Sequence, residues 1–500
     1  MQPDYDKFPQ IPPNCRLNYN AKSNLYQVYR EQRTRDPNTG AIKVVRETIG
    51  SIRNGVFTFG QTYLSQEEIR RKDAEITLLR KQLSELMSGA DVRLTEQTEK
   101  QAPAILDTIK TAASDSSLEP RRKKSILVPM ADIALVSLMS ALCSNTDAQS
   151  IADFAHNHAE FLGRYFPEFD SVHMTRDTVR RALLLAKTKA MGDFYMRLTQ
   201  ALVRKGAERV IPVDGQAVRA TGRRSKDNPD VHSASMLMNI FDANARVCLV
   251  HRLIPKKTNE MTVGPELLAG LDVRGAVVTA DAMNCQVRFV TRVLTSGADY
   301  LISLKGNQDK TNSEAINLFA TTHEDQIVTH QGEVELAHGR IEQRTIEILP
   351  GRLASTMLRE KWQGLESGSF VRMRKVVTNK KTEQTSDEYS YYVTSLPCSQ
   401  DCAQRILSVV RAHWTIENNL HWVLDVYWNQ DRMQASNANY ISNRSLLNKL
   451  ALALLEHYRV WLYDKGLVPD NRDLSIPALQ ARCANPKYAI ECLAAGFKYI

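Results

Sequence analysis

The spacing of apolar side chains changes several times along the chain, and the first clear pattern has the two-residue period of β-strands. From Asn24 onward, two β-rich runs flank residues 36–40, whose Asp-Pro-Asn-Thr-Gly sequence is strong turn chemistry. Residues 1–62 are therefore predicted to form an N-terminal β-hairpin module. Basic side chains on both runs fit contact with DNA and fit a solvated hairpin face equally well.

Residues 63–92 change to a seven-residue period. The repeated apolar positions are Ile69, Ile76 and Leu83, with Leu79 and Leu86 in the complementary seam. This pattern is typical of a coiled coil, which would pair two chains into a homodimer. An intramolecular amphipathic helix explains the same pattern, because the repeat is short and Lys72 interrupts the seam.

Polar composition separates this helix from a second helical region. Residues 93–125 are polar and poor in apolar periodicity, so they are predicted to form a linker. Residues 126–205 read as helices throughout and are predicted to form a helical domain. At the far end, residues 461–500 carry no informative pattern and are treated as a C-terminal tail.

From about residue 208 the pattern predicts strands that alternate with helices. The expected strands are ERVIPVDG, SASMLMNIFDA, ARVCLVHRLI, GAVVTADAM and ADYLISLKG, with helices in EMTVGPELLAGL and NCQVRFVTRVLTSG. The first three strands follow one another in hairpin order, and each of the last two follows a helix. This order predicts an α/β fold with a mixed sheet that has a parallel part.

Composition and charge narrow the class of protein. The chain of 500 residues is too long for one core, and no apolar run is long enough to cross a membrane, so a cytoplasmic protein is expected. Eight cysteines without a CxxC pair indicate reduced thiols rather than a zinc site. The net charge of +9 is compatible with a polyanionic partner. One basic cluster, a candidate DNA contact that a solvated loop would also explain, comprises Arg219, Arg223, Arg224 and Lys226.

Two aspartates are expected at the ends of strands, where open α/β sheets usually have their functional sites. Asp214 is expected at the end of the first strand of the sheet and Asp281 at the end of the fourth. If these strands are parallel neighbours, both side chains emerge at the same sheet end. Carboxylate oxygens are ligands that Mg²⁺ prefers. Taken singly, each aspartate is also explained as a turn former or a helix cap.

A third acid is expected from the stretch RAHWTIENNLHWVLDVYW, residues 411–428. In a helix, Glu417, His421 and Asp425 form one polar stripe, and a neighbouring apolar stripe can pack on the sheet. Glu417 could then meet Asp214 and Asp281. Trp414 and Trp422 are interpreted as core aromatic residues at helical spacing.

Several of these segments together resemble a known family. The matching motifs are VDG (213–215), TADAMNCQ (279–286), YLISLKGNQ (300–308), HGRIEQR (338–344) and HWTIENNLHWVLDV (413–426). They closely resemble the DDE-type transposases of bacterial insertion sequences, in the branch of the H-repeat-associated proteins. The resemblance covers roughly residues 125–460.

The resemblance implies a fold, a metal and a partner. It implies a ribonuclease H-like catalytic domain over residues 206–460, with a β-rich insertion at about 310–400. Asp214, Asp281 and Glu417 would be its catalytic, metal-binding triad, holding two Mg²⁺ ions, with Mn²⁺ as a substitute. The partner would be double-stranded DNA, both element ends and target, in the bacterial cytoplasm near the nucleoid.

The resemblance also implies which other side chains contact DNA. Lys305, Asn307 and Gln308 follow a strand and would hold DNA near the metals. The Tyr-Arg-Glu-Lys signature of related transposases is not kept here, where Val410, His413 and Leu424 stand at its other positions. Arg411 and His413 are the candidate substitutes.

The function that the resemblance implies is cleavage of the ends of an insertion sequence and their transfer to target DNA. Two alternatives stay open on sequence alone. One is a metal-dependent nuclease without strand transfer, which needs the same acids. The other is an inactive or domesticated DNA-binding derivative that keeps them.

Overall fold

The computed structural model divides the chain into two compact units, Met1–Asp91 and Val92–Ile500. In the first unit it describes residues 15–20, 25–35, 42–53 and 56–59. In the second it describes residues 96–497 except 115–116, 167, 204–208, 225–231, 255–259, 285, 338 and 468–473. The predicted coiled coil at 63–92 lies outside these residues.

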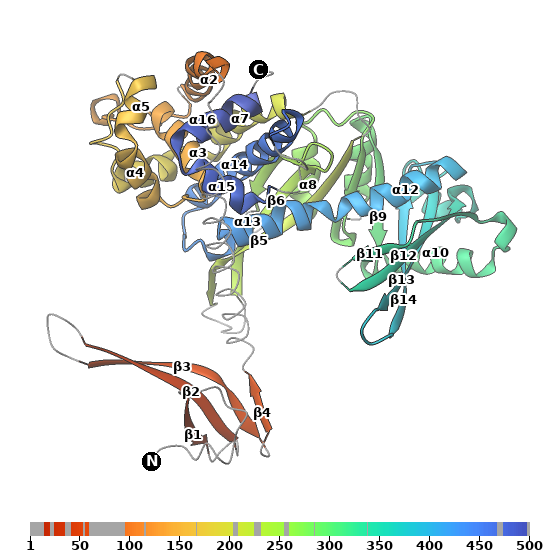
Figure 1. The fold of residues 1–500 in the computed structure, drawn as a ribbon. Coiled ribbons are helices and arrows are strands. Elements are labelled where there is room, and N and C mark those ends of the chain that lie inside the picture. The colour runs from red at the N-terminus through yellow and green to blue at the C-terminus, as the bar shows by residue number, and fades with distance from the viewer. Residues whose placement is uncertain are drawn as a thin grey trace. The chain divides into compact units, whose positions relative to one another are not determined.

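The N-terminal unit contains a four-stranded antiparallel sheet in the order β1-β2-β3-β4 (Figure 1). The strands are β1 (Arg16–Asn20), β2 (Leu25–Arg35), β3 (Ile42–Arg53) and β4 (Val56–Phe59). The pairing of β2 with β3 confirms the predicted hairpin, whereas β1 and β4 were not predicted. Cys15, Val28, Ile49 and Ile52 form a small core in this unit.

In the larger unit, the described strands form one mixed sheet of ten strands. They are β5 (Val210–Arg224), β6 (His232–Asp242), β7 (Val247–Leu253), β8 (Val277–Ala280), β9 (Asp299–Leu304), β10 (Val328–Gln331), β11 (Glu335–Ala337), β12 (Arg340–Pro350), β13 (Ser369–Asn379) and β14 (Thr385–Thr394). The order is β10-β12-β13-β14-β9-β8-β5-β6-β7, with β11 beside β12. Strands β5, β8 and β9 are parallel neighbours, and the other pairs are antiparallel. All five strands predicted from residue 208 onward are confirmed.

The segment predicted as a β-rich insertion, about 310–400, supplies strands β10 to β14 and two helices. These helices are α10 (Asp309–Thr321) and α11 (Thr356–Lys361). Strand β14 pairs antiparallel with β9, so the segment extends the same sheet.

Strand β5 is longer than the sequence predicted, which corrects the position of Asp214. The strand continues to Arg224 because its second half pairs with β6. Its parallel pairing with β8 covers only Val210 to Val213, opposite Val277 to Ala280. Asp214 therefore lies inside β5, at the point where the parallel pairing stops, and not at the end of the strand.

Helices cover both faces of the sheet. On one face, apolar side chains of α8 (Glu260–Leu268), α9 (Val287–Thr295), α10 and α11 pack on alternate residues of the central strands. On the other face, α12 (Gln400–His413) places Ile406, Val409 and Val410 against Val210, Val277 and Leu301. The Ser399 hydroxyl accepts a hydrogen bond from the Cys402 backbone N–H and caps the start of α12.

A mostly helical core lies at the β7 end of the sheet (Figure 1). Its helices are α2 (Glu96–Ala113), α3 (Met130–Leu142), α4 (Ala148–Asn157), α5 (Ala159–Tyr165), α6 (Arg176–Leu185), α7 (Thr188–Thr199), α14 (Ala438–Asp464), α15 (Ile476–Cys483) and α16 (Pro486–Phe497). Phe241 of β6 and Val247 of β7 belong to the same core, so the helices of 126–205 pack against the sheet and the C-terminal helices.

Two predictions about the ends of this region are wrong. The stretch taken as a linker contains α2, whose Leu106 and Ile109 are fully buried in the helical core. The stretch taken as a tail contains α15 and α16, whose Leu479 and Leu493 are buried in the same core. Helix α2 buries apolar residues spaced among polar ones, whereas α15 and α16 are short and bury most of their residues.

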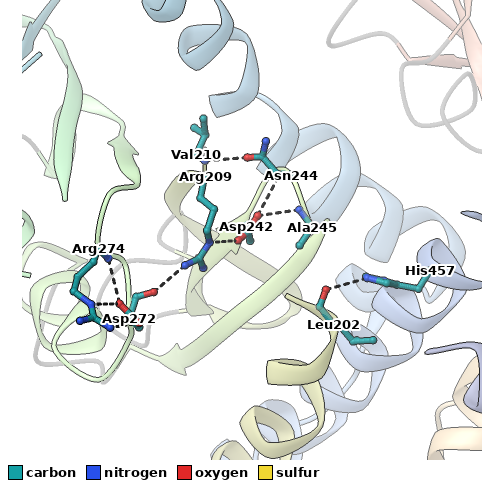
Figure 2. A network of polar contacts seen from close by, with 9 residues as sticks. All are labelled: Leu202, Arg209, Val210, Asp242, Asn244, Ala245, Asp272, Arg274 and His457. Atoms are coloured by element: carbon teal, nitrogen blue, oxygen red, sulfur yellow. Dashed lines mark hydrogen bonds and ion pairs between the residues drawn. The ribbon is translucent and has the colours of Figure 1, made fainter. Parts of the chain in front are cut away.

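A polar network fixes the start of β5 beside the β6–β7 turn (Figure 2). The Asp242 carboxylate is 1% exposed and accepts hydrogen bonds from Arg209 Nε and from the backbone N–H groups of Asn244 and Ala245. The Asn244 side chain accepts a hydrogen bond from the backbone N–H of Val210. These contacts satisfy a buried carboxylate and hold β5 four residues before Asp214.

Two expectations from composition can be compared with the described residues. None of the seven cysteines among these residues forms a disulfide. No described helix is both long and apolar enough to span a membrane.

Candidate active site

Strand alternation places the two aspartates on the same face of the sheet. Val213 pairs with Ala280 in parallel register, so Asp214 and Asp281 are the next residues along two neighbouring strands. Side chains alternate between faces along a strand. Asp214 and Asp281 therefore share the face of Val210 and Val277, which is the face that α12 covers.

A single pocket of about 640 Å³ brings the three predicted acids together. Asp214, Asp281 and Glu417 all line it. The other side chains of its wall include Thr279, Ser303, Lys305, Tyr389, Tyr391, Tyr392, His413 and Trp414. The acids come from β5, the residue after β8, and the helical segment after α12, which are far apart in sequence.

Asp281 is held by three hydrogen bonds to one carboxylate oxygen. Its Oδ1 accepts from the Ala282 backbone N–H at 2.7 Å, from Ser303 Oγ at 3.1 Å and from Lys305 Nζ at 3.0 Å. Partial burial raises the pKa of Asp281, but these hydrogen bonds and the Lys305 charge outweigh burial and leave the pKa below its ordinary value. The carboxylate is thus ionised and already paired with a cation.

Asp214 faces a buried histidine. Its Oδ2 lies 3.6 Å from Nδ1 of His421, whose side chain is only 11% exposed. Burial, and then the charge of Lys449, lowers the pKa of His421 to about 3. The ring is therefore neutral at pH 7, and the contact is not an ion pair despite its distance.

Glu417 stands in a π-helical turn. Helix α12 is followed by a π-helix, η8 (Ile416–His421), and then by α13 (Trp422–Tyr427). The Trp422 backbone N–H donates to the Glu417 carbonyl oxygen, five residues back, which is the hydrogen bond of a π-helix. The Glu417 side chain is exposed and borders the pocket. Single π turns often mark functional sites.

The apolar stripe beside Glu417 packs differently from the prediction. Ile416, Leu420, Val423 and Leu424 are buried, but in the helical core rather than mainly on the sheet. The polar stripe faces the sheet instead. Its last member, Asp425, accepts a hydrogen bond from Gln216 of β5 at 3.1 Å.

The environment of Asp425 favours its protonated form. Burial, and then the nearby Asp431 carboxylate, raises the pKa of Asp425 to about 7. Gln216 in turn accepts a hydrogen bond from Gln430 at 2.8 Å. Asp425 does not line the pocket of the three acids and belongs to a separate polar cluster.

Of the predicted DNA-contacting side chains that the structure describes, only Lys305 and His413 line the pocket. His413 Nδ1 lies 2.9 Å from Thr279 Oγ1, and burial lowers the pKa of His413. Asn307 donates to the Ala282 carbonyl oxygen at 2.5 Å, beside Asp281. Gln308 accepts a hydrogen bond from Lys361 at 2.7 Å.

The remaining predicted DNA contacts lie elsewhere in the fold. Arg411 pairs with Glu335 and lines a different pocket, between α12 and strands β10 and β11. Arg219 is exposed on β5 and forms an ion pair with Asp431 at 3.3 Å. The backbones of Arg223 and Arg224 continue β5, while their side chains lie outside the described residues.

Two tryptophans predicted to lie in the core are at the surface. Trp414 is 53% exposed and Trp422 is 47% exposed, which contradicts that prediction. The tryptophan of this stretch that is buried is Trp428, whose Nε1 donates to the Ala141 carbonyl oxygen at 2.8 Å. Helical spacing alone could not separate them, because the π turn changes which side of the helix each residue occupies.

Sequence patterns did not identify several other residues near the site, because only the tertiary structure brings these residues together. Ser303 reaches Asp281 only because β9 is the parallel neighbour of β8. Asn239 and Lys449 are fully buried polar residues of β6 and α14, and neither belongs to a short motif. His251 of β7 contacts Ser442 and Lys449.

In the described part of the chain, no three His, Cys, Asp or Glu side chains are close enough together to hold one metal ion. The three acids line the same pocket, but they do not surround a single point as the ligands of a bound metal would. Beside Asp281, the Lys305 ammonium shows that this position stabilises positive charge.

Comparison with known proteins gives consistent matches. Residues 205–454 match the family model described as "Transposase DDE domain". The chain is 28% identical over 342 residues to "Putative transposase YncI" of Escherichia coli O157:H7, covering 67% of this chain and 84% of that protein. It is 25% identical over 341 residues to "H repeat-associated putative transposase YhhI" of Escherichia coli K12, covering 66% and 86% respectively.

Proposed function

The chain belongs to the DDE transposase family, and from this premise we propose that it cleaves the ends of an insertion sequence and joins them to target DNA. The observation that carries the proposal is the meeting of Asp214, Asp281 and Glu417 in one pocket. Two of the acids come from neighbouring parallel strands and the third from a helix on the same face of the sheet. The proposed catalytic acids are these three.

The donor chemistry of the pocket fits a divalent cation. Carboxylate oxygens are the ligands that Mg²⁺ prefers, and Lys305 Nζ already occupies a cation position 3.0 Å from Asp281. We assign Asp214, Asp281 and Glu417 as the residues that would hold two Mg²⁺ ions, with Mn²⁺ as a substitute. Bound metal would supply Lewis acidity that activates water and stabilises the departing 3′-oxygen.

The chain's own groups would position the DNA. Lys305 is 64% exposed at the edge of the pocket and can exchange its carboxylate partner for a phosphate. Asn307 and His413 lie beside the same acids. Arg219, Arg223, Arg224, Gln308 and Arg411 are proposed as more distant contacts with the double-stranded DNA backbone.

The proposed organisation is a ribonuclease H-like catalytic domain over 206–460. The order β7-β6-β5-β8-β9, with three antiparallel strands followed by two parallel ones, supports it. The segment at about 310–400 is then an insertion that continues the sheet beyond β9. Pairing of two chains through residues 63–92 is also proposed.

The decisive experiment uses DNA that carries the sequences flanking the coding region. The full chain is incubated with this DNA, a target plasmid and Mg²⁺, and cut and joined products are separated by electrophoresis. We expect both products. Asp281→Asn should reduce both by at least about 100-fold, because it removes a metal-binding charge.

A matched control is Asp272→Asn. Asp272, like Asp281, pairs with a basic residue close to it in the fold, here Arg274, but it lies outside the pocket. This variant should react like the parent. Equal activity of the parent and Asp281→Asn would refute the assigned acids, and cutting without joining would favour a nuclease.

A further inference from the structure

A fully buried lysine lies behind the proposed active site. Lys449 of α14 is 1% exposed, and burial lowers its pKa to about 8. Its Nζ donates to Asn239 Oδ1 at 2.6 Å and to His251 Nδ1 at 2.7 Å. A buried ammonium is costly unless its donors are satisfied, so its retention calls for a physical reason.

Lys449 fixes the orientation of the Asn239 amide. An ammonium can only donate hydrogen bonds, so the amide must turn its oxygen toward Lys449. The Asn239 Nδ2 group then points the other way. It lies 3.0 Å from Nε2 of His421 and also donates to the Leu237 carbonyl oxygen at 3.3 Å.

The amide orientation in turn determines the tautomer of His421. Because the Asn239 Nδ2 group can only donate, the His421 Nε2 atom at 3.0 Å must accept and carries no proton. The ring proton must therefore lie on Nδ1. That N–H faces Asp214 Oδ2 at 3.6 Å, which is longer than a hydrogen bond, so the contact is an electrostatic one between the N–H dipole and the carboxylate.

The second acceptor of Lys449, the His251 ring, is also held in a single tautomer. His251 Nδ1 accepts from Lys449, so its proton lies on Nε2, which donates to Ser442 Oγ at 3.0 Å. Ser442 belongs to α14, like Lys449, and is buried. This branch leads away from the pocket and provides a comparison for the branch that leads to Asp214.

We propose that Lys449, Asn239 and His421 form a positioning relay that directs a neutral N–H dipole at Asp214. The relay rests on the proposed function for the importance of Asp214. A neutral donor orients the carboxylate without cancelling its charge. Partners behind metal ligands commonly change metal affinity by about 10–100-fold.

A purely structural role for Lys449 makes a different prediction. If the lysine only anchors α14 to β6 and β7, the tautomer of His421 is irrelevant and metal affinity need not depend on Lys449. The relay requires both a single tautomer and this dependence. The two readings can therefore be separated by measurements that do not involve DNA.

The first measurement is the tautomer of His421 in the full chain, by ¹⁵N NMR of histidine-labelled protein at pH 7, with assignment by comparison with His421→Asn. We expect a protonated Nδ1 and an unprotonated Nε2. A proton on Nε2, or a doubly protonated ring, would overturn the relay. This test needs no variant of Lys449 and no added metal.

The second measurement is the affinity for Mn²⁺ alone, by titration calorimetry. Lys449→Met replaces the buried charge with an apolar side chain of similar length, and circular dichroism and the thermal unfolding curve first establish that the variant is folded. We expect about 10-fold weaker Mn²⁺ binding and loss of the single His421 tautomer. The control, Ser442→Ala, alters only the branch through His251 and should bind Mn²⁺ like the parent.

The outcomes separate this inference from the proposed function. Equal Mn²⁺ affinity in the parent and a folded Lys449→Met would overturn the relay. A parent chain that shows the expected tautomer and Mn²⁺ dependence but cuts no DNA would refute the transposase activity and leave the relay standing. A parent that binds no Mn²⁺ would refute the metal site, and the tautomer would still decide the arrangement of the relay.

Discussion

At the scale of single residues, neighbouring carboxylates in this fold differ because their surroundings differ. Asp281 accepts hydrogen bonds from Lys305 and Ser303, which outweigh its partial burial and keep it ionised. Asp425 is buried next to Asp431, and its pKa rises to about 7. The ionised carboxylate of Asp281 is suited to holding a cation, whereas Asp425, with its raised pKa, is suited to be a neutral partner of Gln216.

The raised pKa of Asp425 predicts a dependence of stability on pH. Its folded-state pKa of about 7 lies above the value of about 3.9 for an unfolded aspartate. Between these pH values the folded state binds more protons, so this group makes the free energy of unfolding fall as pH rises. Asp425→Asn removes the effect and should stabilise the protein at pH 8 by about 1–2 kcal/mol, allowing for partial exposure.

Urea denaturation of the parent and Asp425→Asn at pH 4.5 and pH 8 would test this. The amide oxygen of the variant can still accept from Gln216, so the two proteins should be close in stability at the lower pH. A stabilisation that is the same at both pH values would contradict a titrating Asp425.

At the scale of elements, the π turn and the insertion show how local geometry serves the site. The π turn lies between α12 and α13 and carries Glu417 at the edge of the pocket while His421 reaches Asn239.

The insertion depends on close backbone packing where β12 ends. A Cβ atom added at Gly351 would lie 1.9 Å from the Leu365 carbonyl oxygen.

Gly351→Ala should therefore destabilise the protein by about 3 kcal/mol or more, since the backbone must move to admit a methyl group. The matched control is Gly192→Ala in the interior of α7, where an added Cβ meets nothing within 4 Å. That change should stabilise by about 0.5–1 kcal/mol, because alanine favours the helix. Thermal unfolding followed by circular dichroism would distinguish the two, and equal melting temperatures would contradict the packing argument.

At the scale of the whole molecule, the mixed sheet and the helical core are continuous in the larger unit. Helix α14 packs with α3, α7 and α16 and also carries Lys449 behind the proposed active site. Near its C-terminal end, Tyr458 donates to Glu491 of α16 and accepts from Arg482 Nε at 2.7 Å. Helices α15 and α16 thus hold α14, whose Lys449 is proposed to orient His421 toward Asp214.

Truncation after Gly466 should unfold the larger unit. It removes α15 and α16, including the fully buried side chains of Leu479, Ile490 and Leu493. Each such side chain contributes about 1.5–3 kcal/mol of burial, and together they approach the total stability of about 5–15 kcal/mol of a typical domain. Soluble yield and the thermal unfolding curve would measure the effect. A truncated chain that stays soluble and melts like the parent would contradict this role.

The sequence by itself indicated the first five strands of the sheet and the three candidate acids. Apolar spacing predicted the five strands from residue 208 onward, because each buried strand requires a run of apolar residues between turns. Its motifs pointed to Asp214, Asp281 and Glu417, which line one pocket. Periodicity did not predict α2, whose apolar residues are few, or α15 and α16, which are short and bury most of their residues.

Tertiary structure alone decided how these parts meet. Parallel register makes Asp214 and Asp281 neighbours, and the pairing of β5 with β6 keeps Asp214 inside a longer strand. The contacts of Asn239 and Lys449 join positions 210 residues apart in the chain. Periodicity describes one element at a time, whereas pKa values, tautomers and pockets depend on which elements are packed together.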